Sequence, residues 1–220
     1  MTSAFVTFEG LDGCGKSTQL RMLARELYSR GFEVVTTREP GGTPLGEKLR
    51  EVLLDAGADV DPLAELLLFA ADRANHVRTI IEPALKTGHI VLSDRYADAT
   101  IAYQGAGRRV PADIVRQIVS LATGGLTPDL TLIFDVPVDE SHARTLNRLG
   151  GDHLGGDKSS NDRYDTEDIE FRIRVRKAYL GVAESEPDRV VIINANGSIE
   201  EIHALVVETV FDRLKLHLDV

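Results

Sequence analysis

The sequence predicts an α/β fold in which a five-stranded parallel sheet is covered by helices on both faces. Five short apolar runs, rich in branched or aromatic residues, are typical of buried strands. These runs are Ala4–Phe8, Val34–Thr37, Ile90–Leu92, Leu130–Phe134 and Val190–Ile193. Because helix-length segments separate them, we expect right-handed crossovers and parallel strands, with ligands at the carboxyl ends of the strands.

The helix-length segments have their own signals. Leu20, Leu23, Ala24 and Leu27 recur at helical spacing after the first run. Further segments of helical length follow Thr43, Asp61, Pro111, Asp139, Thr166 and Ser198. The alternation of strands and helices continues along the whole chain, which favours one layered fold.

Composition limits the classes of function. The 220 residues contain 43% hydrophobic side chains, enough for one sizeable core, so we expect residues 1–220 to form a single domain. The formal net charge of −10 disfavours a nucleic-acid partner. Cys14 is the only cysteine, and neither a membrane-spanning run nor a signal-peptide pattern is present, which favours a cytoplasmic location without membrane contact.

The segment Leu149 to Asp162 interrupts the alternation of strands and helices. It is crowded with Gly, Asp and Ser and has no apolar periodicity, so it is either an idle linker or a mobile loop. Arg144, Arg148 and Arg163 flank it, and these cations favour a short lid at about residues 148–165 that closes over a charged ligand.

The most specific motif lies directly after the first predicted strand. Gly10, Leu11, Asp12, Gly13, Cys14, Gly15, Lys16 and Ser17 match the P-loop pattern, and Thr18 follows. A glycine-rich turn without a ligand is the alternative, but a strand before the motif and a helix after it favour a phosphate cradle. The motif therefore predicts a P-loop NTPase fold that binds a polyphosphate, with Lys16 on the β- and γ-phosphates and Ser17 on Mg²⁺; alone it does not separate a kinase from a GTPase or a mechanical ATPase.

Charged residues follow the next two strands of the predicted sheet. Arg38 ends the second strand, and Asp94 and Arg95 end the third. Asp94 could hold a water on Mg²⁺, and Arg95 could bridge two phosphate groups; a surface ion pair between them is the alternative. The Asn-Lys-x-Asp motif that reads guanine is absent, so the sequence does not favour a GTPase.

Five segments together resemble bacterial thymidylate kinases. They are GLDGCGKST, REPGGT, LLFAADRANHV, SDRYADATIAYQG and DRYD, and the resemblance runs from the first strand to the last helix. The combination of REPGGT with DRY is more specific than the P-loop. The resemblance implies phosphorylation of dTMP to dTDP with ATP and Mg²⁺ as a step toward dTTP, in an enzyme that is commonly a homodimer.

The resemblance also assigns residues to the acceptor nucleotide. Phe69 and Arg73 lie four residues apart on one helix face, and Thr100, Tyr103 and Gln104, at i, i+3 and i+4, share another. In the family, Phe69 stacks on thymine, Arg73 donates to a thymine carbonyl, and the second group contacts the pyrimidine edge and the sugar. From the residues alone, Phe69 is a core residue and the second group a polar helix surface.

Charged residues complete the implied machinery. By resemblance, Asp12 approaches the 3′-hydroxyl and the magnesium shell, and Arg38 binds the acceptor phosphate. Arg144 packs against adenine, and Asn194 to Gly197 border its edge. Gly13 and Cys14 stand where some eukaryotic relatives carry an arginine, so a lid arginine, Arg148 or Arg163, is expected to supply the transition-state cation. Ala99, Asp165 and a longer lid depart from the family pattern.

Other interpretations of the sequence remain open. A kinase of the same fold could act on dUMP, UMP, AMP or GMP, because one methyl group in a pocket contributes only about 1 to 3 kcal/mol of preference. A nucleotide-dependent switch could bind ATP without an acceptor. Phe69, Arg73 and Gln104 argue for a pyrimidine, and the arginines at the two strand ends argue against a switch.

Overall fold

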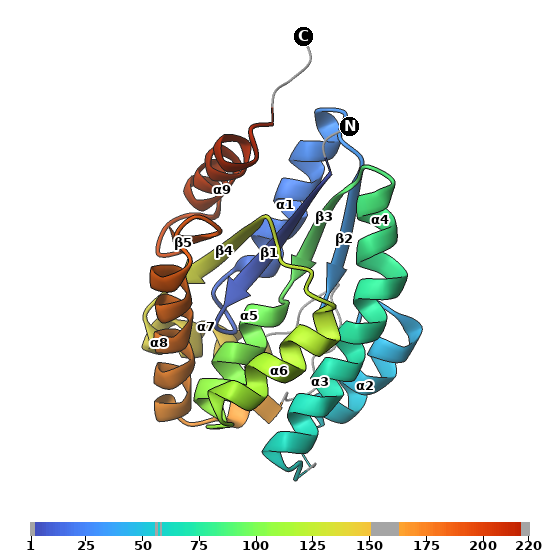
Figure 1. The fold of residues 1–220 in the computed structure, drawn as a ribbon. Coiled ribbons are helices and arrows are strands. Elements are labelled where there is room, and N and C mark those ends of the chain that lie inside the picture. The colour runs from blue at the N-terminus through green and yellow to red at the C-terminus, as the bar shows by residue number, and fades with distance from the viewer. Residues whose placement is uncertain (1–2, 56, 58, 151–162, 217–220) are drawn as a thin grey trace.

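Five parallel strands form the centre of the protein in a computed structural model that describes residues 3–216 except 56, 58 and 151–162 (Figure 1). The sheet order is β2-β3-β1-β4-β5. Its strands are β1 (Ala4–Gly10), β2 (Val34–Arg38), β3 (Ile90–Asp94), β4 (Leu130–Asp135) and β5 (Val190–Asn194). The predicted five-stranded parallel sheet is confirmed, and each strand extends one or two residues beyond the predicted end toward the polar residues that follow.

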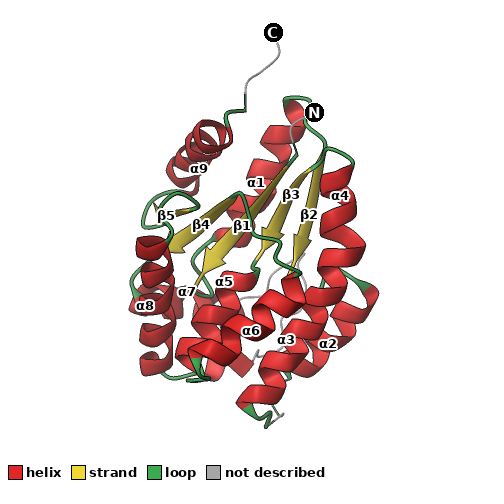
Figure 2. Cartoon of the chain, viewed as in Figure 1, coloured by secondary structure: helices red, strands yellow, loops and turns green. Residues whose placement is uncertain are grey.

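Helices fill the connections between the strands (Figure 2). The α-helices are α1 (Lys16–Ser29), α2 (Pro44–Leu54), α3 (Pro62–His76), α4 (Glu82–Lys86), α5 (Ala97–Thr100), α6 (Ala112–Thr123), α7 (Val138–Gly150), α8 (Ile169–Ser185) and α9 (Ile199–Leu214). Thr43, Asp61 and Ser198 cap α2, α3 and α9 by accepting hydrogen bonds from backbone N–H groups of the first turn. These caps explain why the segments after the three residues begin as helices.

The two faces of the sheet are covered by different helices, as the alternation of side chains along a strand requires. Val6 and Phe8 of β1 belong to a core shared with α1 and α9. Phe5, between them in the sequence, belongs to a core on the other face with Val77 and Ile81. Farther along that second face, α8 packs on β1, β4 and β5 (Figure 1). The predicted coverage of both faces is therefore confirmed.

Three segments depart from regular α-helix. Val77–Ile81 (η1) and Ile101–Gly107 (η2) are π-helices, and Arg163–Thr166 (η3) is a short 3₁₀-helix. A π-helix turn is wider than an α-turn and is frequent at functional sites. In η2 the wider turn shows in a hydrogen bond from the Arg108 N–H to the Tyr103 carbonyl. Residue spacing did not indicate these wide turns.

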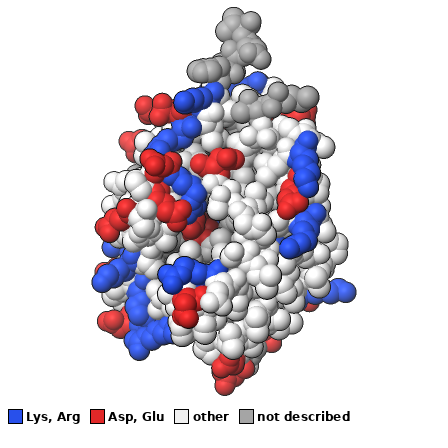
Figure 3. Space-filling model, viewed as in Figure 1, with Lys and Arg blue, Asp and Glu red and all other residues white. Residues whose placement is uncertain are grey.

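Surface charge and helix length bear on what the protein can contact. On the face seen in Figure 3, basic and acidic side chains lie intermixed around a broad uncharged area. Within the described ranges, the helices are too short or too polar to cross a membrane. That all 220 residues form one domain stays a prediction.

Candidate active site

The P-loop turns sharply between β1 and α1, and two of its glycines make the turn possible. Gly10 and Gly13 have φ of 136° and 82°, a region that L side chains rarely adopt. A Cβ atom on Gly10 would lie 2.6 Å from the Phe134 carbonyl oxygen, and one on Gly13 would lie 2.6 Å from that of Ser141. The loop can therefore wrap tightly only because both side chains are absent, which leaves its N–H groups and the start of α1 available to an anion.

Two of the predicted cofactor-binding residues turn their side chains into the core. Leu11 packs with aromatic residues near α8, and Cys14 packs with the core under α1 and α9. Burial raises the pKa of the Cys14 thiol, so it is a neutral packing residue. Leu11 and Cys14 can contact a nucleotide mainly through their backbone.

Two cavities border the P-loop. One, of about 250 Å³, has Asp12, Lys16 and Ser17 in its wall, and we call it the acceptor cavity. The other, of about 390 Å³, is bounded by Gly13, Cys14, Gly15 and Thr18, and we call it the donor cavity. A polyphosphate on the P-loop would therefore have one cavity on each side.

The donor cavity contains the residue predicted to contact adenine. Arg144 of α7 lines it, opposite Gly197 and Ser198 at the start of α9. The Arg144 guanidinium is anchored by Glu140 and by the Ala195 carbonyl at 3.4 Å. An aromatic base could stack on a guanidinium held in this way.

Cations gather at the end of the acceptor cavity next to the P-loop. Lys16 Nζ lies 3.6 Å from Asp12 Oδ1, and Arg95 Nη2 donates to the same oxygen at 2.6 Å. Arg95 also donates to the hydroxyls of Tyr103 at 3.0 Å and Tyr179 at 3.3 Å. Its φ of 72° is uncommon for an arginine, so the surrounding structure holds its backbone in place. The carboxylate of Asp12 thus separates two cations.

The remaining charged residues at the strand ends lie next to one another because β2, β3 and β1 are adjacent. Arg38 and Asp94 are partners in the register of β2 and β3. The Ser17 hydroxyl donates to the Asp94 carboxylate. Arg38 donates to both carboxylate oxygens of Glu47 at 3.1 Å, and both side chains are more than a third exposed. We call this group, with Asp12, Lys16 and Arg95, the phosphate end of the acceptor cavity.

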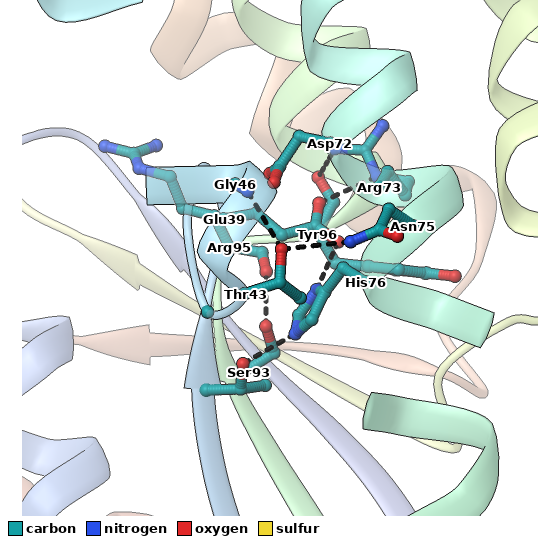
Figure 4. Close-up of polar contacts among 12 residues, drawn as sticks. Glu39, Thr43, Gly46, Asp72, Arg73, Asn75, His76, Ser93, Arg95 and Tyr96 are labelled. Carbon is teal, nitrogen blue, oxygen red and sulfur yellow. Dashed lines mark hydrogen bonds and ion pairs between the residues drawn. The ribbon is translucent and has the colours of Figure 1, made fainter. Parts of the chain in front are cut away.

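The opposite end of the acceptor cavity is built around the buried guanidinium of Arg73, and Figure 4 shows its surroundings. Its Nε donates to Glu39 Oε2 at 2.8 Å, and Nη1 donates to the Thr100 hydroxyl at 2.8 Å. Nη2 donates to the Tyr96 carbonyl at 2.9 Å. A guanidinium has five N–H groups, so two of them remain for a ligand.

Other predicted acceptor residues surround Arg73. Phe69 lies one helical turn before it and lines the same cavity, as do Thr100, Tyr103 and Gln104. The Gln104 amide nitrogen donates to Glu65 Oε1 at 2.7 Å and to the Tyr164 hydroxyl at 3.2 Å. We call Phe69, Arg73, Thr100 and Gln104 the base end, because they combine one aromatic face with a few fixed polar groups.

The comparisons with known proteins agree with this geometry. The family model described as thymidylate kinase matches residues 8–206. This chain belongs to the thymidylate kinase family.

Individual relatives cover nearly the whole chain. The thymidylate kinase of Geotalea daltonii is 44% identical over 96% of this chain and 97% of its own length. That of Leifsonia xyli is 48% identical over 91% of this chain and 90% of its own. The crystal structure of thymidylate kinase from Ehrlichia chaffeensis superposes with a TM-score of 0.77 at 35% identity, covering 96% of this chain and 99% of that one.

The structure describes the side chain of only one of the two predicted lid arginines, Arg148 and Arg163. The side chain of Arg148 and residues 151–162 lie outside the described part of the structure. Arg163 is described: its buried guanidinium donates to Glu65, and it is not among the residues that line the acceptor cavity. The structure therefore gives Arg163 a carboxylate partner behind the base end.

Three residues that line the acceptor cavity or contact its lining were missed by the sequence reasoning. Arg50 of α2 lines the acceptor cavity and donates to the Pro40 carbonyl at 3.0 Å. Glu39 sits inside the quoted REPGGT segment, yet its partnership with Arg73 is visible only in three dimensions. Glu65 precedes Phe69 by one helical turn, and this spacing could have placed it on the same face.

Two buried carboxyl groups near the site have raised pKa values. Burial first, and then the charge of Asp98, raise the pKa of Glu9 to about 8, although Arg95 opposes the shift. Glu9 accepts hydrogen bonds from the Tyr96 N–H and the Tyr179 hydroxyl. Burial and then Glu39 raise the pKa of Asp72 to about 7. Both groups can therefore change charge near neutral pH.

Proposed function

We propose that this protein transfers the γ-phosphoryl group of ATP to thymidine monophosphate, the reaction of the family to which it belongs. One observation carries the proposal. The P-loop lies between two cavities, and the cationic residues at the ends of three adjacent strands line the one that has an aromatic, polar base end. Two phosphorylated nucleotides can enter from opposite sides and meet at the P-loop.

The acceptor would lie with its base between Phe69 and Arg73. Phe69 would stack on thymine, and an unused N–H of Arg73 would donate to a thymine carbonyl, since both residues face the cavity from α3. Thr100 and Gln104 would contact the base edge from the opposite wall. Tyr103, fixed by its hydrogen bonds to Arg95 and Asp12, would fill the space beside the sugar and favour a deoxyribose.

The chemical step requires mainly positioning and charge neutralisation. The nucleophile is a phosphate oxygen that is already anionic at neutral pH, so no general base is needed. Lys16 would hold the β- and γ-phosphates, Arg38 the acceptor phosphate, and Arg95 both. Asp12 now neutralises Lys16 and Arg95, and arriving phosphates would take over that role and leave the carboxylate near the 3′-hydroxyl.

The residues beside the P-loop fit a magnesium ion that arrives with ATP. The Ser17 hydroxyl and the carboxylates of Asp94 and Asp12 are the oxygen ligands that Mg²⁺ prefers, directly or through water. When bound, the ion neutralises charge on the transferring phosphoryl group. Ser17 and Asp94 would orient it from the start of α1 and the end of β3.

The remaining catalytic assignments rest on the sequence. A lid at about residues 148–165, with Arg148 as its transition-state cation, stays a prediction. Arg163 was the second candidate, and its pairing with Glu65 supports an anchoring role for it. Arg144 would pack against adenine from the wall of the donor cavity.

A panel of acceptors tests the proposal. The protein is incubated with ATP and Mg²⁺ and, separately, TMP, dUMP, UMP, AMP or GMP, and ADP and the nucleoside diphosphate are quantified. We expect TMP to react with the highest kcat/KM and dUMP to follow within about two orders of magnitude, because the two differ by one methyl group. ADP formation that no acceptor stimulates would instead favour the ATP-binding switch.

We also propose that the protein is a homodimer in the cytoplasm. The surface over α3 and α6 is largely uncharged on the side seen in Figure 3, and Leu63, Leu67 and Leu121 of these helices are 46%, 51% and 78% exposed. Paired helices of two copies would cover these leucines. Sedimentation at micromolar concentration tests the assembly, and a Leu121→Glu variant should shift the protein toward the monomer.

A further inference from the structure

Glu65 is a buried carboxylate behind the base end, and the reaction itself gives it no task. It lies on α3, four residues before Phe69 and eight before Arg73, so the three side chains share one face of the helix. Its side chain is fully buried and does not line the acceptor cavity. A buried charge requires partners, and the identity of those partners indicates what this one does.

The two oxygens of Glu65 have different main partners. Oε1 accepts from the Gln104 amide nitrogen at 2.7 Å and from the Tyr164 hydroxyl at 2.6 Å. Oε2 accepts from the Arg163 guanidinium and from Arg108 Nε at 3.1 Å, and Arg108 Nε also makes a longer contact of 3.4 Å with Oε1. Two guanidinium groups therefore compensate the charge on one side, while the other side holds the Gln104 amide.

This arrangement determines which end of the Gln104 amide faces the cavity. An ionised carboxylate only accepts hydrogen bonds, so Gln104 must turn its NH₂ group toward Glu65. The second amide hydrogen faces the Tyr164 oxygen at 3.2 Å, because the Tyr164 proton is donated to Glu65. Among the described residues, the Gln104 carbonyl oxygen has no hydrogen-bond partner, and Gln104 lines the cavity. Its free group is therefore an acceptor.

We infer that Glu65 is a positioning residue that sets the polarity of base recognition by holding the Gln104 carbonyl toward the acceptor. This inference rests on the proposed function and extends it to the chemistry of the base edge. Arg73 presents donors and Gln104 presents an acceptor, a pattern that complements a pyrimidine with a carbonyl at C4 and an N–H at N3. Cytosine offers an amino group and an unprotonated N3, so both contacts would be mismatched.

Substitution of Glu65 by Gln should reverse this polarity. Arg108 and Arg163 donate on one side of residue 65, so the new amide would turn its carbonyl toward them and its NH₂ toward Gln104. Gln104 would then flip to accept that hydrogen bond and would present its own NH₂ to the base. The variant keeps the shape of the side chain, so the expected change is one of specificity.

The test compares dUMP with dCMP, two acceptors of nearly equal size whose difference is confined to the base edge that Gln104 would read. The ratio of their kcat/KM values is measured within one preparation, so any loss of folded protein cancels. We expect Glu65→Gln to lower the dUMP/dCMP ratio about tenfold or more, because the contact of Gln104 at N3 becomes mismatched for uracil and matched for cytosine, whereas the donors of Arg73 stay as they are. An unchanged ratio would overturn the inference.

Two further variants separate positioning from general structural support. Arg108→Met removes a partner of Glu65 but leaves the Gln104 contact, so its ratio should stay within about twofold of the unmodified protein. In a Gln104→Leu background, Glu65→Gln should leave the ratio unchanged. An equal fall in Arg108→Met, or a full fall in the Leu background, would contradict the mechanism. Failure of the unmodified protein to phosphorylate TMP would overturn the proposed function instead.

Discussion

The two ends of the acceptor cavity are built on different principles. At the base end, Arg73, Thr100 and Gln104 are each about 1% exposed, and fixed protein partners orient them. At the phosphate end, the Arg38 and Glu47 side chains are 40% and 47% exposed, and Asp12 is shared by Lys16 and Arg95. The base end can select a ligand by its shape and by the direction of its hydrogen bonds. At the phosphate end, cationic side chains are paired with carboxylates that an arriving phosphate can displace.

The difference follows from what each ligand group can contribute. A base is uncharged and gains little from attraction at a distance, so its selectivity depends on polar groups that cannot turn to suit a competitor. A phosphate carries charge and can replace a carboxylate next to an arginine. Rigid partners suit the first task, and exchangeable partners suit the second. The predictions below test this comparison, beginning with the largest expected effect.

Removal of Glu39 should destabilise the base end most strongly. Glu39→Ala leaves the buried Arg73 guanidinium without its charged partner, and such losses cost about 3 to 5 kcal/mol. We expect the free energy of unfolding, measured in urea, to fall by about that amount. The control is Glu51→Ala, an exposed carboxylate on the neighbouring α2, which should change it by less than about 0.5 kcal/mol. Equal effects would mean that the base end is not held as described.

Removal of Arg95 should affect catalysis more than folding. Arg95→Ala is expected to lose about 3 kcal/mol of transition-state stabilisation, a fall of roughly two orders of magnitude in kcat/KM for TMP. Asp12 keeps Lys16 as a partner, so the site would not be left with an isolated carboxylate. Steady-state kinetics and a melting curve measure the two effects. Near-native turnover would refute the role given to Arg95.

The fold was predictable because it depends on local patterns, formed by residues close together in the sequence. Apolar runs, capping residues such as Thr43 and Ser198, and the P-loop are all local signals, and the structure confirms the sheet and its coverage. The π-helix Ile101–Gly107 was not predictable from them. It packs against α8, a contact between distant parts of the chain that residue spacing does not express.

The site was predictable as far as motif and family resemblance extend. Arg38, Arg73 and Arg95 were assigned from the segments that contain them, and they do line one cavity. Their partners were harder to foresee, because Glu39 and Glu65 act across 34 and 39 residues of sequence. A lone glutamate in a helix or turn carries no signal for a contact of that range.

Glu9, a buried carboxyl group near the phosphate end, should make the free energy of unfolding depend on pH. Its pKa is raised to about 8 in the folded protein, so between the ordinary carboxyl range near 4.5 and about 8 the folded state holds a proton that the unfolded chain has released. Stability should therefore fall as pH rises through this window and level off above it. Glu9→Gln should reduce the slope by up to about 1.4 kcal/mol per pH unit, the limit for one proton.

Urea unfolding at pH 5.5, 6.5 and 7.5 measures that slope. Asp72, with its pKa raised to about 7, contributes in the same direction, so some slope should remain in Glu9→Gln. A double variant that also carries Asp72→Asn should be flatter still. If the slope is the same with and without Glu9, then Glu9 is ionised in the folded protein throughout this range, and Arg95, Tyr96 and Tyr179 together stabilise its charge.

Substitution of Glu47 should have the smallest effect on stability and activity. It tests most directly the contrast between the base end and the phosphate end. The Arg38–Glu47 pair is exposed, so Glu47→Gln should change the free energy of unfolding by less than about 1 kcal/mol. Because Arg38 would no longer have to leave a carboxylate before it binds the acceptor phosphate, KM for TMP should stay level or fall, by about fivefold at most, with kcat unchanged. A rise in KM would mean that Glu47 orients Arg38 for the phosphate. The phosphate end would then be preorganised as the base end is, and the contrast between them would disappear.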